Sequence, residues 1–216
     1  MFEKDKELKQ KMEKNLDFRI WQKFKKGDEK AFSYIFDTYS SQLYEYGKRF
    51  TLDHENIKDS IQDVFFELAS RRFYISETDN ILFYLLKSLR HKIFQNLKKK
   101  KYVQSSIENF DKENFILEYS TEVSEEEKEF KLNLVAKAIN DLSPRQKEII
   151  YLKFYKNLSN KEVAQITKIK AQSVSNSIQK SILKLKKILN SSPKTTIFLF
   201  RVYCKINKTE STDCIL

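Results

Sequence analysis

An all-α protein with two small domains is the fold class that this sequence predicts, and three observations support it. The 216 residues include only two glycines and two prolines, so few tight turns can be built. Apolar residues recur at spacings of three and four along most of the chain, which is the period of a helix surface. Serine followed three residues later by glutamate or glutamine marks the start of several of these segments as capping boxes.

The first predicted domain spans residues 17–101 and is preceded by a highly charged stretch, residues 1–16, expected to be a frayed helix or a disordered arm. We expect helices at about 17–26, 28–50, 53–71 and 80–101, with a loop at 71–80. The predicted buried stripes of the last three are Phe32, Ile35, Phe36, Tyr39, Leu43, Tyr46 and Phe50; Ile57, Ile61, Val64, Phe65 and Leu68; and Ile81, Leu82, Leu85, Leu89, Ile93 and Leu97.

The third helix carries acidic and aromatic side chains opposite its apolar stripe. Asp59, Gln62, Asp63 and Phe66 are spaced so that they share one face, on a chain that is otherwise basic. A solvated face has no need of a phenylalanine, so an acidic and partly aromatic patch on a basic chain is notable. From the residues alone, the alternative is a solvated helix face with one stray aromatic side chain.

The fourth helix combines basic and aromatic residues. Phe83, Tyr84 and Phe94 alternate with Lys87, Arg90 and Lys92, and a lysine run covers residues 98–101. Cations that follow phosphates and rings that stack on bases are the two elements of single-stranded nucleic-acid binding. The alternative is that the rings pack inward and the lysines only solvate the helix.

Residues 102–123 are polar and irregular and are expected to form a flexible linker. The second predicted domain, residues 124–190, contains helices at about 124–140, 144–157, 160–167 and 171–190. Capping boxes open three of them, at Ser124, Ser143 and Ser159. The tail, residues 191–216, includes a short β-prone run, and its role stays open.

The last two of these helices have the layout of a helix-turn-helix, a short helix and a longer one joined by a three-residue turn. The predicted inner face of the longer helix is Val174, Ile178, Ile182, Leu185 and Leu189. Its outer face offers amide, hydroxyl and amine groups at Gln172, Ser173, Ser175, Asn176, Gln179, Lys180 and Lys184. Glutamine and asparagine can pair with adenine edges in the major groove, and lysines can reach phosphates, so we expect this helix to read duplex DNA.

Composition narrows the remaining function classes. The net charge of +11 and the pI near 9.4 favour a polyanionic partner, nucleic acid before membrane. No glycine-rich phosphate loop is present, and His54 and His91 have no cysteine nearby, so we expect no cofactor and no metal. Cys204 and Cys214 form no disulfide framework, and the charged start of the chain is not a signal peptide. With no apolar run of about 20 residues to span a membrane, these features predict a cytoplasmic protein.

Taken together, four motifs resemble the extracytoplasmic-function (ECF) group of bacterial sigma-70 family sigma factors. Ala31-Phe32 with Ile35-Phe36, and then IKDSIQDVFFEL at 57–68, resemble the start of region 2 and its region 2.2. NILFYLLKSLRHKIFQNLKKK at 80–100 looks like regions 2.3 and 2.4. LSPRQ at 142–146, followed by NKEVAQITKIKAQSVSNSIQKSILKLKKIL at 160–189, resembles region 4.

The resemblance implies a function that the residues alone do not. Asp59, Gln62, Asp63 and Phe66 would bind the clamp helices of the largest subunit of core RNA polymerase. The loop 71–80 and the following helix would open the promoter −10 element and capture a flipped base, using Tyr74, Asn80, Tyr84, Lys87, Arg90, His91, Lys98 and Lys99. The helix from Ala171 would read the −35 element in duplex form with the seven residues of its outer face, near the polymerase flap region. Such a subunit has no catalytic residues of its own, and the family admits an anti-sigma factor as a further partner.

Five positions depart from the family pattern. Tyr84 stands where tryptophan is usual, which keeps a ring for stacking, while His91 and Gln95 stand where asparagine and aspartate are usual. Lys168 replaces the glycine of the helix-turn-helix turn, and a lysine at positive φ costs about 1 kcal/mol, which favours a turn of different shape. Lys170 replaces a serine, so the reading helix loses a capping hydroxyl.

Two other function classes are compatible with parts of the sequence. A helix-turn-helix regulator that binds duplex DNA without being a polymerase subunit would not need the basic and aromatic helix beside an acidic face. An enzyme acting on nucleic acid could hold magnesium between Asp59 and Asp63, but no further ligands are visible in the sequence.

Overall fold

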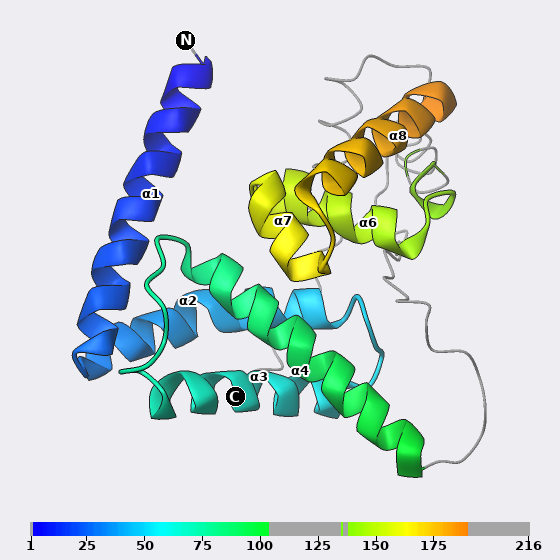
Figure 1. The fold of residues 1–216 in the computed structure, drawn as a ribbon. Coiled ribbons are helices and arrows are strands. Elements are labelled where there is room, and N and C mark those ends of the chain that lie inside the picture. The colour runs from blue at the N-terminus through cyan, green and yellow to red at the C-terminus, as the bar shows by residue number, and fades with distance from the viewer. Residues whose placement is uncertain (1, 104–134, 136–137, 190–216) are drawn as a thin grey trace, which may run out of the picture. The chain divides into compact units, whose positions relative to one another are not determined.

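The computed structural model describes residues 2–103, 135 and 138–189, and all regular structure in those residues is helical (Figure 1). This confirms the predicted all-α class. The chain divides into two compact units, residues 1–106 and 107–216, which are described separately here. Nearly all of the predicted linker, most of the predicted helix at 124–140 and the whole tail lie outside the described residues.

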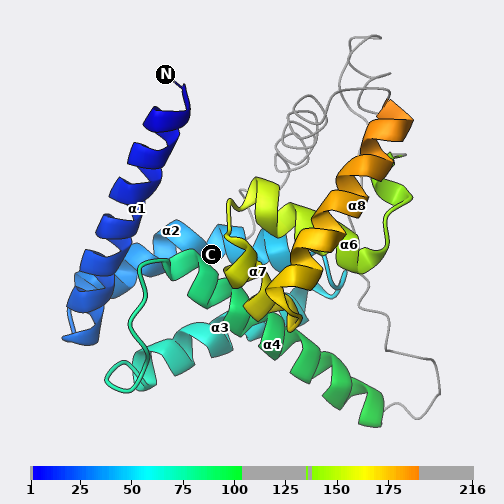
Figure 2. The ribbon, with the colours of Figure 1, turned by 45° about the horizontal axis from the view of Figure 1, so that its top comes forward.

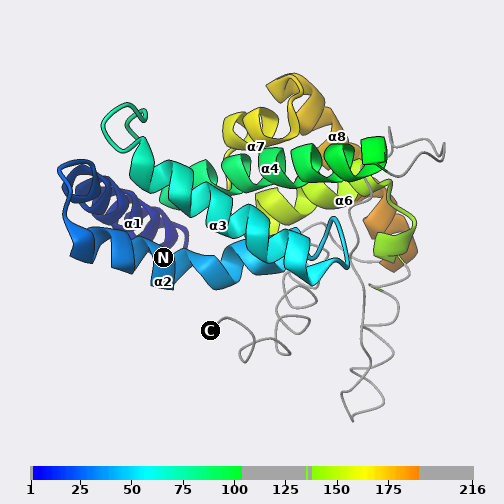
Figure 3. The same ribbon diagram turned by 90° about the horizontal axis from the view of Figure 1, so that it is seen from below.

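The first unit contains α1 (Phe2–Lys25), α2 (Glu29–Gly47), α3 (His54–Ser70) and α4 (Ile81–Val103). The side chains of Asp28 and Asp53 cap α2 and α3 by accepting backbone N–H groups of the first turn, which is why these helices begin where the sequence predicts. α1 begins at Phe2, so the charged residues 2–16 are helical and continuous with the predicted first helix. α2, α3 and α4 pack on one another, and α1 packs on α2 and α4 (Figures 1 and 3).

The predicted stripe of α3 is buried at all five positions. The stripes of α2 and α4 each need correction. Phe36 is 38 % exposed, Leu82 and Leu97 are only partly buried, and Leu86 is fully buried instead. α2 and α3 approach closely at Gly47, where a Cβ atom would lie 2.6 Å from the Ile57 side chain, so only glycine allows this packing.

The second unit contains α6 (Pro144–Ile150), the π-helical segment η1 (Tyr151–Tyr155), α7 (Asn160–Thr167) and α8 (Ala171–Leu189). α6 and α7 both pack against α8 (Figure 2). The capping boxes predicted at Ser143 and Ser159 are both formed, each with the serine and the side chain three residues later bonding to backbone N–H groups. The predicted helix at 144–157 is instead α6 followed by the wider π turn.

The turn between α7 and α8 places Lys168 in the left-handed conformation, with φ 55° and ψ 42°. Its backbone N–H still bonds to the carbonyl of Ala164, as in a helix that ends on glycine. The chain therefore accepts the strain of a lysine here and keeps a left-handed residue in the turn. On the inner face of α8, Ile182 is only partly buried, and the fully buried residue beside it is Ser181, whose hydroxyl donates to the Ser177 carbonyl at 2.8 Å.

Candidate nucleic-acid and protein interfaces

The acidic face of α3, which we define as Asp59, Gln62, Asp63 and Phe66, is exposed at all four positions. Phe66 is 73 % exposed, and it shares its helix face with the carboxylates of Asp59 and Asp63. The apolar stripe on the other side of α3 holds the helix in the bundle. The side chains of the acidic face are thus held on a rigid element and are available to a partner.

Lys92 of α4 lies at the edge of the acidic face, which the sequence did not predict. Its amine hydrogen bonds to the Glu67 carboxylate and lies 3.7 Å from Oδ2 of Asp63. The hydrogen bond with Glu67 raises the pKa of Lys92, with the nearby carboxylate charges adding to the effect. Lys92, expected among the cations for nucleic acid, instead joins α4 to α3.

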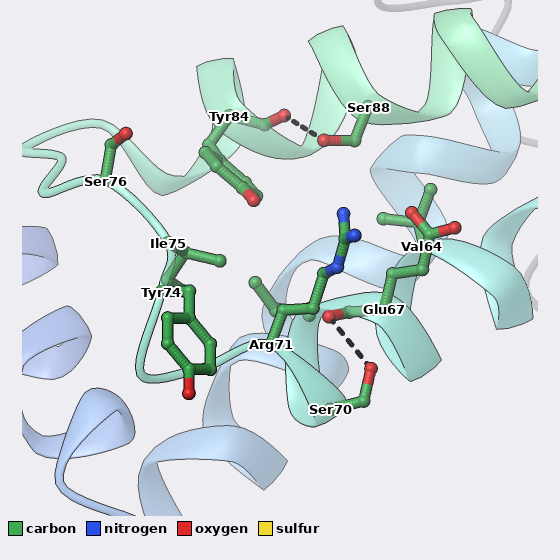
Figure 4. A pocket seen from close by; sticks show the side chains of 10 residues that line it. Val64, Glu67, Ser70, Arg71, Tyr74, Ile75, Ser76, Tyr84 and Ser88 are labelled. Carbon is green, nitrogen blue, oxygen red and sulfur yellow. Dashed lines mark hydrogen bonds between the residues drawn. The ribbon is translucent and has the colours of Figure 1, made fainter.

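A pocket of about 610 Å³ lies between the end of α3, the loop 71–80 and the first turns of α4 (Figure 4). This volume is within the range of roughly 300–1,000 Å³ that is usual for small-ligand sites. Its lining residues are Val64, Glu67, Leu68, Ser70, Arg71, Tyr74, Ile75, Ser76, Tyr84 and Ser88. The pocket offers two tyrosine rings, one cation, one carboxylate and several hydroxyl groups, a set suited to a flat heterocycle with polar edges.

Tyr84 forms one wall of this pocket, and its ring and the Arg71 guanidinium both point into it (Figure 4). Behind it lies the fully buried indole of Trp21, with ring centroids 4.9 Å apart. Burial raises the pKa of Tyr84, and the Glu67 carboxylate adds to this while Arg71 opposes it. The tyrosine is therefore a neutral ring that packs on Trp21 at an interplanar angle of 59° and also lines the pocket.

The loop 71–80 also presents two rings to solvent. Tyr74 is 91 % exposed and Phe73 is 64 % exposed, with the Arg72 guanidinium 4.6 Å from the Phe73 ring. Asn80, predicted to contact DNA, has a local task as well. Its side-chain oxygen accepts the N–H of Phe83 at 2.9 Å, which caps the first turn of α4.

The predicted DNA-contacting residues of α4 separate into exposed and buried positions. Lys87, His91 and Lys98 are exposed and share one face of the helix. Arg90 is only 5 % exposed, with its guanidinium 4.7 Å from the Phe94 ring, so the prediction that it reaches DNA does not fit its place in the packing. Helical spacing alone did not distinguish Arg90 from its exposed neighbours. The side chain of Lys99 lies outside the described residues.

On α8, Gln172, Ser173, Asn176, Gln179 and Lys180 are exposed together, as predicted for a surface that reads bases. The Gln172 amide donates to Oδ1 of Asn176 at 3.1 Å, which aligns the two amides along the helix. Two other predicted residues, Ser175 and Lys184, make hydrogen bonds within the second unit.

Ser175 is only partly exposed, accepts from Asn160 of α7 at 2.9 Å and donates to the Ala171 carbonyl at 3.2 Å. The Lys184 amine hydrogen bonds to the Asp141 carbonyl ahead of α6. Both side chains therefore hold the helix-turn-helix together, and they are less available to DNA than their neighbours on α8.

Arg145 connects α6 to the helix-turn-helix turn. Its guanidinium donates to the carbonyl of Thr167 at 2.6 Å, directly before Lys168. A cation at the end of a helix stabilises the carbonyls that have no partner in the last turn. Sequence reasoning missed this contact, because nothing in the spacing relates residue 145 to residue 167.

The described residues contain no group of three or more histidine, cysteine, aspartate or glutamate side chains positioned to hold a metal ion. Among the helices of this part of the chain, none has both the length and the apolar character of a membrane span.

Comparison with known proteins finds one sequence match and several similar folds. Residues 132–185 match the family model described as "Sigma-70, region 4". A search among curated protein sequences finds no match. The fold of the chain is similar to that of CnrH, solved in complex with the cytosolic domain of CnrY, with 15% identity, a TM-score of 0.51, and coverage of 81% of this chain and 97% of CnrH.

It is also similar to the sigma factor RpoE of Bartonella quintana, solved in complex with the anti-sigma factor NepR. There the identity is 19%, the TM-score is 0.53, and the coverage is 76% of this chain and 99% of RpoE. At these identities the likeness establishes the fold.

The described residues form two helical units, and residues 132–185 match sigma-70 region 4, which includes the helix-turn-helix. The resemblance to ECF sigma factors of the sigma-70 family is confirmed, through the sequence match in region 4 and through the fold shared with a known sigma factor. Sigma factors direct initiation of transcription, while the polymerase catalyses it.

Proposed function

We propose that this protein binds core RNA polymerase and directs it to promoters by recognising −10 and −35 elements. The observation that carries the proposal is the presence, in one chain, of an exposed acidic docking face, a ring-walled pocket beside it and a region 4 helix-turn-helix. A duplex-binding regulator needs only the last of these. A polymerase specificity subunit uses all three.

The first domain, residues 17–101 of the proposed arrangement, does two tasks on neighbouring surfaces. The acidic face of α3 docks on the clamp helices of the polymerase's largest subunit, with Phe66 as the apolar centre and Asp59 and Asp63 as charges around it. The loop 71–80 and α4 then open the −10 element. Exposed Phe73 and Tyr74 meet the separating bases, and Lys87, His91 and Lys98 follow the phosphates.

The pocket beside Tyr84 receives one base that leaves the duplex. Unstacking a base costs a few kcal/mol, and stacking on an aromatic side chain recovers about 1–3 kcal/mol. Because Trp21 already supports the Tyr84 ring from behind, this ring is held in place before DNA arrives. Arg71 and the serine hydroxyls can then hydrogen bond to the base edge.

The second domain, residues 124–190, binds the −35 element in duplex form. Gln172 and Asn176 read base edges, Lys180 contacts phosphate, and the domain lies near the polymerase flap region. Residues 102–123 connect the two domains. Since RpoE is solved with an anti-sigma factor, we propose an anti-sigma partner for this chain too, and we place the protein in the cytoplasm with the polymerase.

Reconstitution with core RNA polymerase tests the proposal. The full chain is added to purified core enzyme, complex formation is measured by gel filtration, and transcription start sites are mapped on genomic DNA. We expect a stoichiometric complex and start sites that share −10 and −35 sequences. DNA binding without a polymerase complex would instead establish the duplex-binding regulator.

A further inference from the structure

Asp17 of α1 joins three helices of the first domain. Its Oδ1 accepts the hydroxyl of Tyr39 in α2 at 2.8 Å, and its Oδ2 accepts the backbone N–H of Ile81 at 2.8 Å. Ile81 is the first residue of α4, directly after the loop 71–80. Asp17 therefore supplies a helix cap from 64 positions away in the chain, in addition to the local cap from Asn80.

The same helix holds the loop at three more places. The Trp21 indole N–H donates to the Ser76 carbonyl at 3.0 Å, and Gln22 and Lys25 both bind the Glu77 carboxylate. Lys14 lies 3.3 Å from the Asp79 carboxylate. α1 is thus the support against which the loop and the start of α4 are positioned, although the pocket itself has no residue of α1 in its lining.

Burial of a carboxylate at this position is unfavourable in itself. Loss of solvent raises the pKa of Asp17, and the hydrogen bonds from Ile81 and Tyr39 oppose that effect. A neutral side chain would fill the space without this cost. The carboxylate has one advantage over it, because a negative charge at the first turn of α4 matches both the unpaired N–H groups and the positive end of that helix.

We propose that Asp17 is a positioning residue for promoter opening, which fixes the start of α4 and with it the loop 71–80 and the Tyr84 wall of the pocket. This inference rests on the proposed function for its effect on DNA. Asp17 touches neither the acidic face nor α8 through any of these bonds. Its replacement is expected to impair strand opening and to leave polymerase binding and −35 binding intact.

Three variants test the positioning role, each made in the full chain. Asp17→Ala removes both bonds, Asp17→Asn keeps the shape and removes the charge, and Trp21→Phe keeps a ring behind Tyr84 while removing the bond to Ser76. The matched control is Tyr44→Phe, which removes a hydrogen bond of the same 2.8 Å length, to His54, at the opposite end of α3 from the loop.

Two measurements are made on each variant. The first uses holoenzyme: opening of the −10 element is monitored by 2-aminopurine fluorescence, and the affinity for core polymerase is determined in parallel. The second is hydrogen exchange of the amides of residues 71–84 in the free protein, which requires no polymerase. A loss of general stability would raise exchange throughout the domain, whereas a positioning role raises it in the loop and the first turn of α4.

We expect Asp17→Ala to slow opening by about tenfold and Trp21→Phe by about threefold, the size of effect that follows from loss of one or two hydrogen bonds, with polymerase affinity changed by less than about twofold. Asp17→Asn is expected to fall between wild type and Asp17→Ala, which keeps the test valid if the alanine variant does not fold. Tyr44→Phe should match wild type in the loop.

Unchanged loop exchange in both Asp17 variants, or opening that falls only in proportion to polymerase affinity, would overturn the inference. If wild-type protein itself opens no promoter with core polymerase, the proposed function is wrong, and the exchange data still decide whether Asp17 positions the loop.

Discussion

The two nucleic-acid-binding regions of this protein are assembled in different ways. The helix-turn-helix is built mostly from residues closer in sequence: capping boxes of four residues, the Asn160–Ser175 bond across 15 positions, and the Arg145–Thr167 bond across 22, with one longer bond, Lys184–Asp141, across 43. The loop and pocket of the first domain depend on bonds that span 52 to 65 positions, all made by α1. The helix-turn-helix can therefore be recognised from a short stretch of sequence, whereas the pocket cannot.

The largest expected effect separates the two domains by function. Replacing Asp59 and Asp63 with lysine reverses the charge of the acidic face without touching the buried stripe of α3. We expect affinity for core polymerase to fall by about 100-fold or more, because like charges placed across an interface cost several kcal/mol. Equilibrium binding to labelled core enzyme measures it.

The control for this change is Asp37→Lys, a single charge reversal on an exposed residue of α2. It should leave polymerase affinity within about twofold of wild type. Duplex −35 binding by the free protein should be unaffected in all of these variants. Retention of core enzyme by the double variant would show that the docking face lies elsewhere.

A smaller effect is expected from the pocket wall. Tyr84→Ala removes the stacking ring, and we expect opening of the −10 element to slow by about 10- to 100-fold, corresponding to the 1–3 kcal/mol of one base–ring stack. Tyr84→Phe retains the ring and should open promoters nearly as well as wild type. Permanganate reactivity of −10 thymines measures both, and equal loss in the two variants would assign the effect to the hydroxyl instead of stacking.

Variants of region 4 should change which −35 sequences the protein prefers. Gln172→Ala with Asn176→Ala is expected to cost about 1–3 kcal/mol of binding free energy on the preferred −35 sequence and much less on other sequences. The difference in affinity between preferred and other sequences therefore becomes smaller. Lys180→Ala should weaken binding to all sequences alike. It should also lower the slope of log affinity against log salt concentration by about one. Binding to a panel of duplexes at several salt concentrations checks both. Promoter opening per bound complex should stay unchanged, in contrast to the Tyr84 variants.

The smallest effect concerns the turn between α7 and α8. Lys168→Gly relieves a left-handed lysine, and we expect the free energy of unfolding of this domain to rise by at most about 1 kcal/mol, partly offset by the greater freedom of glycine in the unfolded chain. Hydrogen exchange of α7 and α8 measures the change. Asn157→Gly, at the other left-handed residue (φ 56°), is the comparison, and its effect should be smaller because asparagine tolerates this conformation well.

Helices and caps were predictable because their signals are local. The starts at Asp28, Asp53, Ser143 and Ser159 follow from capping chemistry within three residues, and the α3 stripe follows from period alone. The candidate site was only partly predictable. Exposure of the acidic face and of most of the α8 surface follows from the same period, since the residues opposite a buried stripe face solvent.

What could not be predicted depends on which helices meet. Lys87 and Arg90 look equivalent in sequence, but the packing of α4 buries one and exposes the other. Lys92 looks like a nucleic-acid contact until α3 places Asp63 and Glu67 beside it. The pocket requires the end of α3 and the start of α4 to lie together, and the Asp17–Ile81 bond spans 64 positions. No local sequence pattern predicts either of them.

The bonds between α1 and the loop also bear on the order in which the domain folds. Closing a chain over about 60 residues costs more entropy than closing a four-residue box, and it becomes favourable only after packed helices share the cost. Because α1 precedes residues 76–81 in the chain by about 50 positions or more, the Trp21 indole and the Asp17 carboxylate cannot make these bonds until the loop and the start of α4 are in place. We expect the Tyr84 wall of the pocket to be the last part of the first domain to become ordered. It should therefore be the first part to lose its order when the domain is destabilised.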